Sequence, residues 1–247
     1  MFRNLLYLFV LACLVSACNT TQQHIADADI IYNRAEQSIE GSDEEIADMI
    51  GPYKEEMDAQ MNEVLGYLNE DLKKSRPNSN MGNWFCDALL YMAEKYHGGD
   101  VAFAAQNYGG LRVPFIGKGE LTKGKVYELM PFDNMLVILE MSGDNVKKFL
   151  DNVARSGGWP ISEGVSFKIM DDQASNIMID NKAWDAGSTY LVALPDYVAN
   201  GGDGSHFLKD IKRYNTGVYI RDVIIEFLKD MQSQSRELTI DNTIRIN

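Results

Sequence analysis

The sequence has few of the residues from which metal centres, disulfide frameworks and basic surfaces are built. Among its 247 residues there are three Cys and three His, and 23 Lys and Arg stand against 36 Asp and Glu. Three Cys cannot make a disulfide framework, and no H-x-H, H-E-x-x-H or paired C-x-x-C motif is present. The formal net charge of −13 argues against a general nucleic-acid binder, because a run of phosphates needs cations to neutralise it. We therefore expect no metal site in this chain.

A long apolar run is also missing, apart from one at the start of the chain. Arg3 and the apolar residues from Leu5 to Val15 have the pattern of a secretory signal. This run is shorter than the ~20 residues that a membrane-spanning helix needs. Val15-Ser16-Ala17-Cys18 resembles a bacterial lipobox, whose Cys is acylated and becomes the mature N-terminus. The alternative is a plain secretory signal with an incidental Cys.

The lipobox divides the first 43 residues into a signal peptide over residues 1–17 and a lipidated polar tether over residues 18–43, with Cys18 as the lipidation site. We expect the protein in the bacterial cell envelope, anchored by lipid to the periplasmic or the surface face of a membrane. Once Cys13 is removed with the signal and Cys18 is acylated, Cys86 is the remaining thiol. We expect Cys86 to be a small buried apolar residue.

From residue 44 onward, apolar residues recur first at a helical spacing. Steps of three and four residues predict a long helix from residue 44 to Leu72, and a second helix that ends at Gly98-Gly99. The same spacing predicts helices over residues 144–154 and 216–231, the latter with Thr216 as its N-cap.

The middle of the chain has a strand-like period instead. Short apolar runs bounded by Gly, Asn, Asp or Pro predict strands at residues 101–105, 125–129, 136–141, 165–170, 176–179 and 190–193. A final strand pair is predicted on either side of Asp241-Asn242. Because helices and strands do not alternate regularly, the sequence predicts an α+β fold.

Four polar or Gly-rich segments adjoin these elements and contain what a nucleotide pocket requires. Arg side chains pair with phosphate oxygens, and aromatic rings stack on bases. Side-chain amides form hydrogen bonds with base edges, and a carboxylate accepts hydrogen bonds from ribose hydroxyls. The segments cover residues 76–83, 106–112, 130–134 and 195–204. The candidates in them are Arg76 and Arg112 for phosphate, Phe132 and Tyr197 for the faces of a base, Asn107 and Asn134 for its edges, and Asp203 for ribose.

Each of these residues also has an ordinary structural interpretation. Gly-Gly pairs are common in turns, Arg112 fits a surface ion pair, and Phe132 and Tyr197 fit positions in a core. Composition and spacing alone therefore indicate an α+β domain with Gly-rich loops and no more specific function.

Taken in order, the four segments resemble the signature of the 5′-nucleotidase C-terminal domain family. Tyr108 departs from the family's pattern, which has Gly at that position. The resemblance extends from about residue 44 to residue 247 and implies a mixed-sheet domain with a long N-terminal helix. The similar elements are Met81-Gly82-Asn83 through Asp87-Ala88, Asn107-x-Gly-Gly-x-Arg112, Leu129-Met130-Pro131-Phe132-Asp133-Asn134 and Ala199-Asn200-Gly201-Gly202-Asp203-Gly204.

The resemblance implies a domain that recognises a nucleotide and does not itself break the phosphate bond. Phe132 and Tyr197 would hold the base between them, and Asp203 would hold the ribose hydroxyls. Arg112 and Arg76 would face the phosphate or the ribose. Carried over from the family's motifs, the substrate-binding residues are Arg76, Asn107, Gly109, Gly110, Arg112, Phe132, Asn134, Tyr197 and Asp203, with no catalytic residue among them.

The family's usual architecture places a metallophosphatase domain before this one. That domain holds two metal ions through Asp-x-His, Gly-Asn-His-Asp/Glu and Gly-His-x-His motifs. The sequence has none of these, and Gly82-Asn83 is followed by Trp84 where the motif has His. We therefore expect no cofactor in this chain and two divalent metals in a separate metallophosphatase partner.

Three hypotheses follow from the resemblance and this departure. In the first, the chain is the nucleotide-recognition part of a split bacterial 5′-nucleotidase and is not catalytic alone. It would present a nucleoside 5′-monophosphate or a related nucleotide for hydrolysis in nucleotide catabolism. In the second, it is a stand-alone nucleotide- or nucleoside-binding lipoprotein for scavenging. In the third, it is a degenerate domain retained for structure or interaction.

Overall fold

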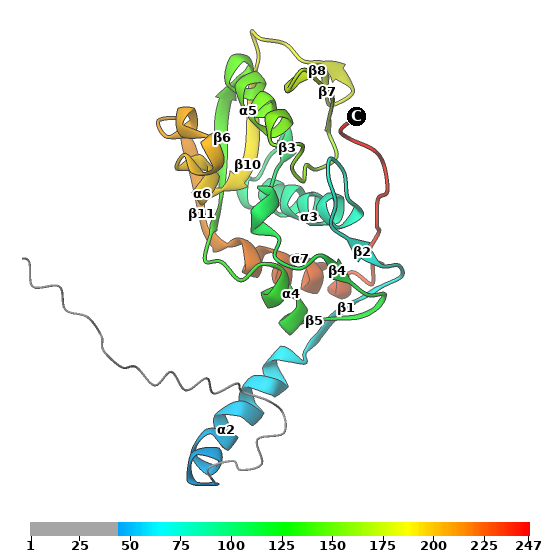
Figure 1. Ribbon diagram of the computed structural model, residues 1–247, viewed down its shortest axis with the longest axis vertical. Helices are drawn as coiled ribbons and strands as arrows, with labels where there is room; N and C mark the ends of the chain where they lie inside the picture. Colours follow the sequence, from blue (N-terminus) through cyan, green and yellow to red (C-terminus); the bar gives the residue numbers. More distant parts are fainter. Residues whose placement is uncertain (1–43) are drawn as a thin grey trace, which may run out of the picture. The chain divides into compact units, whose positions relative to one another are not determined.

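A computed structural model describes residues 44–247 of the chain (Figure 1). The predicted signal peptide, the tether and Cys18 lie outside the described residues. The helices are α2 (Glu44–Met61), α3 (Asn80–His97), α4 (Lys123–Leu129), α5 (Gly143–Arg155), α6 (Asp196–Ala199) and α7 (Ile220–Ser233). The strands are β1 (Val64–Leu68), β2 (Leu72–Lys73), β3 (Phe103–Ala104), β4 (Phe115–Ile116), β5 (Gly119–Thr122), β6 (Met135–Ser142), β7 (Val165–Met170), β8 (Gln173–Ile179), β9 (Lys182–Ala183), β10 (Thr189–Pro195) and β11 (Arg213–Tyr219). Within residues 44–247, none of the helices is long and apolar enough to cross a membrane.

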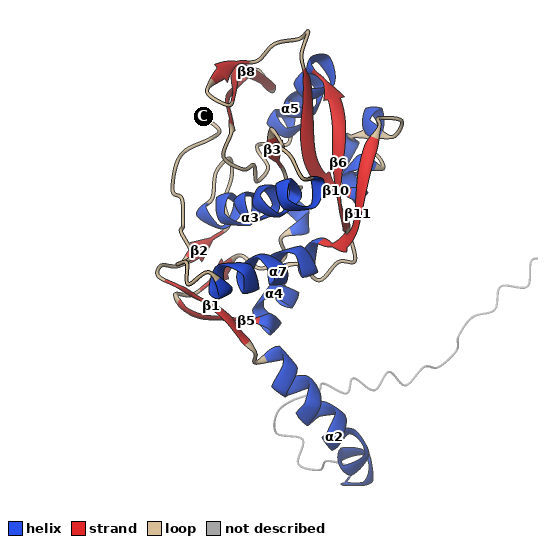
Figure 2. Cartoon of the chain, turned by 180° about the vertical axis from the view of Figure 1, so that it is seen from behind, coloured by secondary structure: helices blue, strands red, loops and turns tan. Residues whose placement is uncertain are grey.

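The largest sheet has four strands in the order β11-β6-β10-β3. Strand β10 is antiparallel to β6 and parallel to β3, and β11 is antiparallel to β6. Figure 2 shows β11, β6 and β10 side by side. Smaller sheets form from β1-β5, β2-β4 and β7-β8-β9. Parallel and antiparallel neighbours in one sheet confirm the predicted α+β fold with a mixed sheet.

The two faces of this sheet pack against different elements, because successive side chains of a strand point to opposite faces. Ile138 and Ala193 belong to a core with α3 and α7. Val137, Leu139 and Val192 belong to a second core with α5 and the β7-β8 hairpin. The sheet is therefore covered on both faces, and ligand access is left to its edges.

The strand directions bring three of the predicted segments to one edge of the sheet. Pro195, at the end of β10, pairs with Leu136, near the start of β6. The segment before β6 and helix α6 after β10 are therefore neighbours. Because β3 runs parallel to β10, the segment 106–112 leaves the sheet at this same edge.

Two predicted helices are confirmed, and each begins with a capped turn. In α3, the hydroxyl of Ser79 accepts a hydrogen bond from the amide of Gly82, and Gly98 ends the helix with a φ of 74°. In α5, the hydroxyl of Ser142 accepts from the amide of Asn145. The thiol of Cys86, on α3, is fully buried as predicted, and burial raises its pKa.

The predicted helix from residue 44 to Leu72 is too long. Helix α2 ends at Met61, and Val64–Leu68 forms β1, which pairs antiparallel with β5. Leu65 and Leu68 are both buried although they lie three residues apart in a strand. The register of this strand pair shifts between Val64 and Gly66. This irregularity gives the strand a spacing that resembles a helical period.

One further element and one helix boundary were predicted wrongly. Residues 125–129, predicted as a strand, lie in helix α4, where Thr122 caps the first turn and Val126 and Leu129 are buried one turn apart. Thr216 does not cap a helix, because it lies in β11 and its hydroxyl donates to the carbonyl of Leu136. Helix α7 begins at Ile220.

The predicted strand pair at the C-terminal end does not form. The backbone of Arg245 and of Asn247 instead hydrogen-bonds to Phe167 of β7. Arg245 is 3% exposed, and its guanidinium donates to the carboxylates of Asp87 and Asp241. The C-terminal segment therefore follows β7 and is joined to α3 by an ion pair between residues distant in the sequence, which local patterns do not reveal.

Candidate functional site

Two hollows open at the edge of the sheet described above, and they share Gly109 and Asp203. The first, which we call the aromatic hollow, has a volume of about 330 Å³ and is lined by Asn107, Gly109, Gly110, Phe132, Asn134, Tyr197 and Asp203. The second, which we call the cationic hollow, has a volume of about 470 Å³ and is lined by Arg76, Tyr108, Gly109, Asn152, Arg155, Ser156, Trp159 and Asp203.

The nine predicted site residues therefore do not all line the same hollow. Seven of the nine line the aromatic hollow, Arg76 lines the cationic hollow, and Arg112 lines neither. The guanidinium carbon of Arg112 lies 5.5 Å from the centroid of the Phe132 ring, so this side chain stands beside the aromatic hollow. Their roles in binding stay predictions.

The two aromatic rings of the first hollow are exposed and do not belong to a core. Phe132 is 38% exposed and Tyr197 is 44% exposed. Phe132 lies in the turn before β6, and Tyr197 lies in α6 after β10. The carboxylate of Asp196 accepts a hydrogen bond of 3.1 Å from the amide of Met135, which ties these two segments together. Rings held this way present apolar surface to a ligand.

Asp203 is held in place by two neutral donors. Its Oδ2 accepts from the amide Nδ2 of Asn107 at 2.7 Å, and its Oδ1 accepts from the hydroxyl of Tyr197 at 3.0 Å. The bond to Asp203 raises the pKa of Tyr197, so this phenol stays protonated and remains a donor. Gly202 is required here, since a Cβ at this position would stand 2.4 Å from the Tyr197 ring.

Asn107 is oriented in turn by Gln106, which sequence reasoning did not single out. The amide Nε2 of Gln106 donates to Oδ1 of Asn107 at 2.9 Å, and both side chains are buried. This bond directs the NH₂ group of Asn107 toward Asp203. Gly110 leaves room for the pair, because a Cβ there would lie 1.9 Å from Nε2 of Gln106.

Two cations lie against Tyr108, which lines the cationic hollow. The ammonium of Lys74 and the guanidinium of Arg76 both lie over the Tyr108 ring, each 3.9 Å from its centroid. Lys74 also donates to the carbonyl of Leu111 at 2.7 Å. Partial burial, and then the nearby charges of Arg112 and Arg76, lower the pKa of Lys74.

These cations have no carboxylate partner among the described residues. Within residues 44–247, no ion pair joins Lys74, Arg76, Arg112 or Arg155 to an Asp or Glu, whereas Arg245 pairs with Asp87 at 2.7 Å. The interpretation of Arg112 as a member of a surface ion pair is therefore wrong for this part of the chain. In a protein of net charge −13, unpaired cations at one edge favour an anionic ligand.

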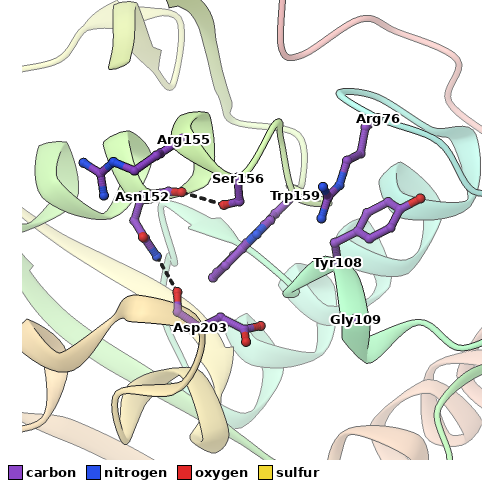
Figure 3. A pocket seen from close by; sticks show the side chains of 8 residues that line it. All are labelled: Arg76, Tyr108, Gly109, Asn152, Arg155, Ser156, Trp159 and Asp203. Atoms are coloured by element: carbon purple, nitrogen blue, oxygen red, sulfur yellow. Dashed lines mark hydrogen bonds between the residues drawn. The ribbon is translucent and has the colours of Figure 1, made fainter. Parts of the chain in front are cut away.

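The far wall of the cationic hollow comes from the end of α5 and the residues after it (Figure 3). Asn152 donates from Nδ2 to the backbone carbonyl of Asp203 at 2.8 Å, and Ser156 donates to the carbonyl of Asn152 at 2.6 Å. Arg155 and Trp159 complete this wall. These residues were not predicted from the sequence, because the sequence of α5 has the pattern of an ordinary amphipathic helix and contains no motif.

The described residues do not fit a two-metal centre. Across residues 44–247, no three His, Cys, Asp or Glu side chains come together in a way that would hold a metal ion. A pair of divalent ions needs such a cluster of ligands. Residues 44–247 therefore offer no ligand set for two divalent ions.

Comparison with known proteins identifies similar chains. A family model described as "5′-nucleotidase, C-terminal domain" matches residues 61–210. A 5′-nucleotidase of Vibrio parahaemolyticus is 29% identical over 197 residues, which are 76% of this chain and 34% of that protein. The cell wall protein Lmo0130 of Listeria monocytogenes is 26% identical over 238 residues, 86% of this chain and 30% of that protein.

The fold also resembles that of a solved structure. The crystal structure of a 5′-nucleotidase precursor from Thermus thermophilus superimposes with a TM-score of 0.70 and 26% identity, over 83% of this chain and 43% of that chain. The chain thus spans about a third of the length of the two curated relatives above.

Proposed function

The chain belongs to the 5′-nucleotidase C-terminal domain family, and we propose that it binds a nucleoside 5′-monophosphate, or a related nucleotide, at the sheet edge where the two hollows meet. One observation carries this proposal: two exposed rings, one oriented carboxylate and a group of unpaired cations lie side by side there. These are the groups that stack on a base, accept from ribose hydroxyls and pair with phosphate.

Each part of the ligand has its own place in this proposal. The base lies between Phe132 and Tyr197, with Asn134 at its edge. The ribose hydroxyls donate to Asp203, whose carboxylate retains lone pairs beyond those used by Asn107 and Tyr197. The 5′-phosphate lies toward Arg112 and Lys74, and Arg76, like Lys74, lies over the Tyr108 ring.

We propose further that a separate metallophosphatase chain carries out the hydrolysis. Residues 44–247 offer a ligand site without a metal-binding cluster, which supports a division of labour between two chains. The two divalent metals expected for the reaction would then belong to the partner. This chain would contribute affinity and orientation of the nucleotide, which are large parts of catalysis in their own right.

The experiment has a binding arm and a catalytic arm. Calorimetry with the purified full chain is expected to show binding of AMP or UMP. Phosphate release from AMP is expected to be absent for the lone chain with Mg²⁺, Mn²⁺, Co²⁺ or Zn²⁺, and present when a co-purified metallophosphatase is added. In that mixture, Arg112→Ala is expected to lower kcat/KM.

The outcomes separate the candidate functions. Absence of nucleotide binding contradicts the whole proposal. Binding without any phosphatase among co-purified proteins favours the stand-alone nucleotide-binding lipoprotein. Robust turnover by the lone chain, lost in Arg112→Ala, contradicts the split enzyme.

We also propose that Cys18 anchors the protein in the cell envelope, by the acylation that the lipobox implies. The similarity to a cell wall protein supports an envelope location, although it does not concern the anchor. Cys18→Ala is expected to move the protein from washed membranes to the released fraction, because each buried acyl CH₂ contributes ~0.8 kcal/mol. An equal membrane fraction for both forms contradicts the anchor.

A further inference from the structure

We propose that the cationic hollow is a second subsite, which takes a phosphate group on the 2′ or 3′ oxygen of the ribose. The preferred ligand would then be a nucleoside bisphosphate, with one phosphate at the 5′ position and one on the other edge of the sugar. This inference rests on the proposed function, because it assumes a nucleotide in the aromatic hollow.

The position of Asp203 relates the two hollows to the two edges of a ribose. Asp203 lines both hollows, and the rings of Phe132 and Tyr197 lie on one side of it. In a nucleotide, the 2′ and 3′ oxygens project from one edge of the sugar and C5′ from the other. When Asp203 faces the 2′,3′ edge, a group attached to that edge points into the cationic hollow.

The charges on the wall of the cationic hollow favour an anion. Arg76 and Arg155 line it, and Asp203 is the one carboxylate among its lining residues. Asp203 already accepts hydrogen bonds from Asn107 and Tyr197, which offset part of its charge. Figure 3 shows Arg76 and Arg155 on opposite sides of Trp159, with Asp203 below them. Guanidinium groups pair with phosphate through two parallel hydrogen bonds.

The same wall offers no free ring on which a second base would stack. The ring of Tyr108 is already covered by Lys74 and Arg76. Trp159 is only 3% exposed and packs edge-on against Phe149, with 5.9 Å between ring centroids. A dinucleotide would therefore place its second base against cations and amides. A phosphate group fits the chemistry of these residues better.

The test compares isomers that carry the same phosphates at different positions. Adenosine 3′,5′-bisphosphate and 2′,5′-bisphosphate are measured against ADP, whose two phosphates are both at the 5′ position, and against AMP. We expect at least one bisphosphate to bind about tenfold more tightly than AMP and ADP, as one charge-assisted pair provides. Calorimetry at constant chloride concentration supplies the dissociation constants, because salt screens such pairs.

A variant assigns the effect to the proposed residue. Arg155→Gln is expected to remove the gain shown by the bisphosphate and to change AMP affinity by less than about twofold, since the charge lies beyond the ribose. Lys148→Gln is the matched control, because Lys148 is an exposed cation on the same helix and lines neither hollow. This control is expected to leave all four affinities unchanged.

The outcomes distinguish this inference from the proposed function. If AMP binds but neither bisphosphate gains affinity over AMP and ADP, the second subsite is wrong and the nucleotide site stands. If Arg155→Gln lowers the affinity for all four ligands equally, the second subsite is also wrong. If none of the four ligands binds, both proposals are wrong.

Discussion

The two hollows that meet at Asp203 differ in what their walls offer a ligand. The aromatic hollow presents the exposed faces of Phe132 and Tyr197 and is lined by no cation. The cationic hollow presents Arg76 and Arg155, while its own rings are covered or buried. One side is therefore suited to a flat, apolar group and the other to a charged one.

This difference reflects how each hollow is built. The aromatic hollow is made by segments that leave one sheet edge, held in register by the pairing of β6 with β10. The far wall of the cationic hollow is formed by the end of α5. The apolar residues of this helix pack on a face of the same sheet. Under the two proposals above, ligand specificity would combine an edge of the sheet with a helix that covers its face.

Removal of either ring is the change expected to weaken nucleotide binding most. Phe132→Ala or Tyr197→Ala is expected to cost ~1–3 kcal/mol in binding AMP or UMP, the range for stacking one base. Calorimetry measures this loss. Tyr67→Ala is the matched control, because Tyr67 is 62% exposed and lines neither hollow. Unchanged affinity in both ring variants contradicts the proposed role of the aromatic hollow.

Replacement of Asp203 sharpens the boundary between the hollows. Asp203→Asn is expected to cost about 1.5 kcal/mol for AMP, since a charged acceptor is lost and an NH₂ group then faces a neighbouring donor. The same variant is expected to lose much less binding free energy for the 2′,3′-dideoxy analogue of AMP, which has no ribose hydroxyls. Tyr197→Phe keeps the ring and removes one of the donors to Asp203, so it separates stacking from hydrogen bonding. Equal losses for both ligands in Asp203→Asn argue against ribose recognition.

Titration of Lys74 is expected to give the smallest effect, of about 1 kcal/mol or less for a partly buried cation at the protein surface. Its pKa is lowered by burial and by Arg112 and Arg76. Phosphate binding favours the charged ammonium, so affinity is complete below this lowered pKa and falls as the pH rises through it. The fall therefore begins at a lower pH than for an ordinary lysine. AMP affinity is measured across about pH 8 to 10, where the phosphate stays a dianion.

A conservative substitution isolates the contribution of Lys74. Lys74→Arg keeps a cation that does not lose its proton in this range. Its AMP affinity is expected to stay constant with pH. The same alkaline fall in both proteins assigns the pH dependence to another group.

Much of the aromatic hollow was predictable from the sequence, because its residues belong to ordered motifs that end or begin strands. Phe132 and Tyr197 are far apart in the chain, and it is the antiparallel pairing of β6 with β10 that brings them to one edge. Lys74 was only weakly indicated by the sequence, where it lies in the basic run Lys73-Lys74-Ser75-Arg76. The structure shows that its ammonium reaches the Tyr108 ring.

The far wall of the cationic hollow was not predictable in this way. Asn152 and Arg155 lie on a helix whose apolar spacing indicates only which side is buried. Their neighbours in space depend on how that helix packs on the sheet and on the turn that carries Asp203. The same reason explains the errors in the fold, where a register shift in β1 and the buried charge of Arg245 override local patterns.

The placement of Trp159 gives the molecule an optical reporter for one half of its site. The sequence has three Trp, and of these Trp84 and Trp184 line neither hollow, while Trp159 lines the cationic hollow. The aromatic hollow contains Phe and Tyr but no Trp. The intrinsic tryptophan emission is therefore expected to change when a charged group binds beside Trp159. It is expected to stay unchanged when a nucleoside fills the aromatic hollow alone. One emission spectrum would thus show how far into the site a ligand reaches.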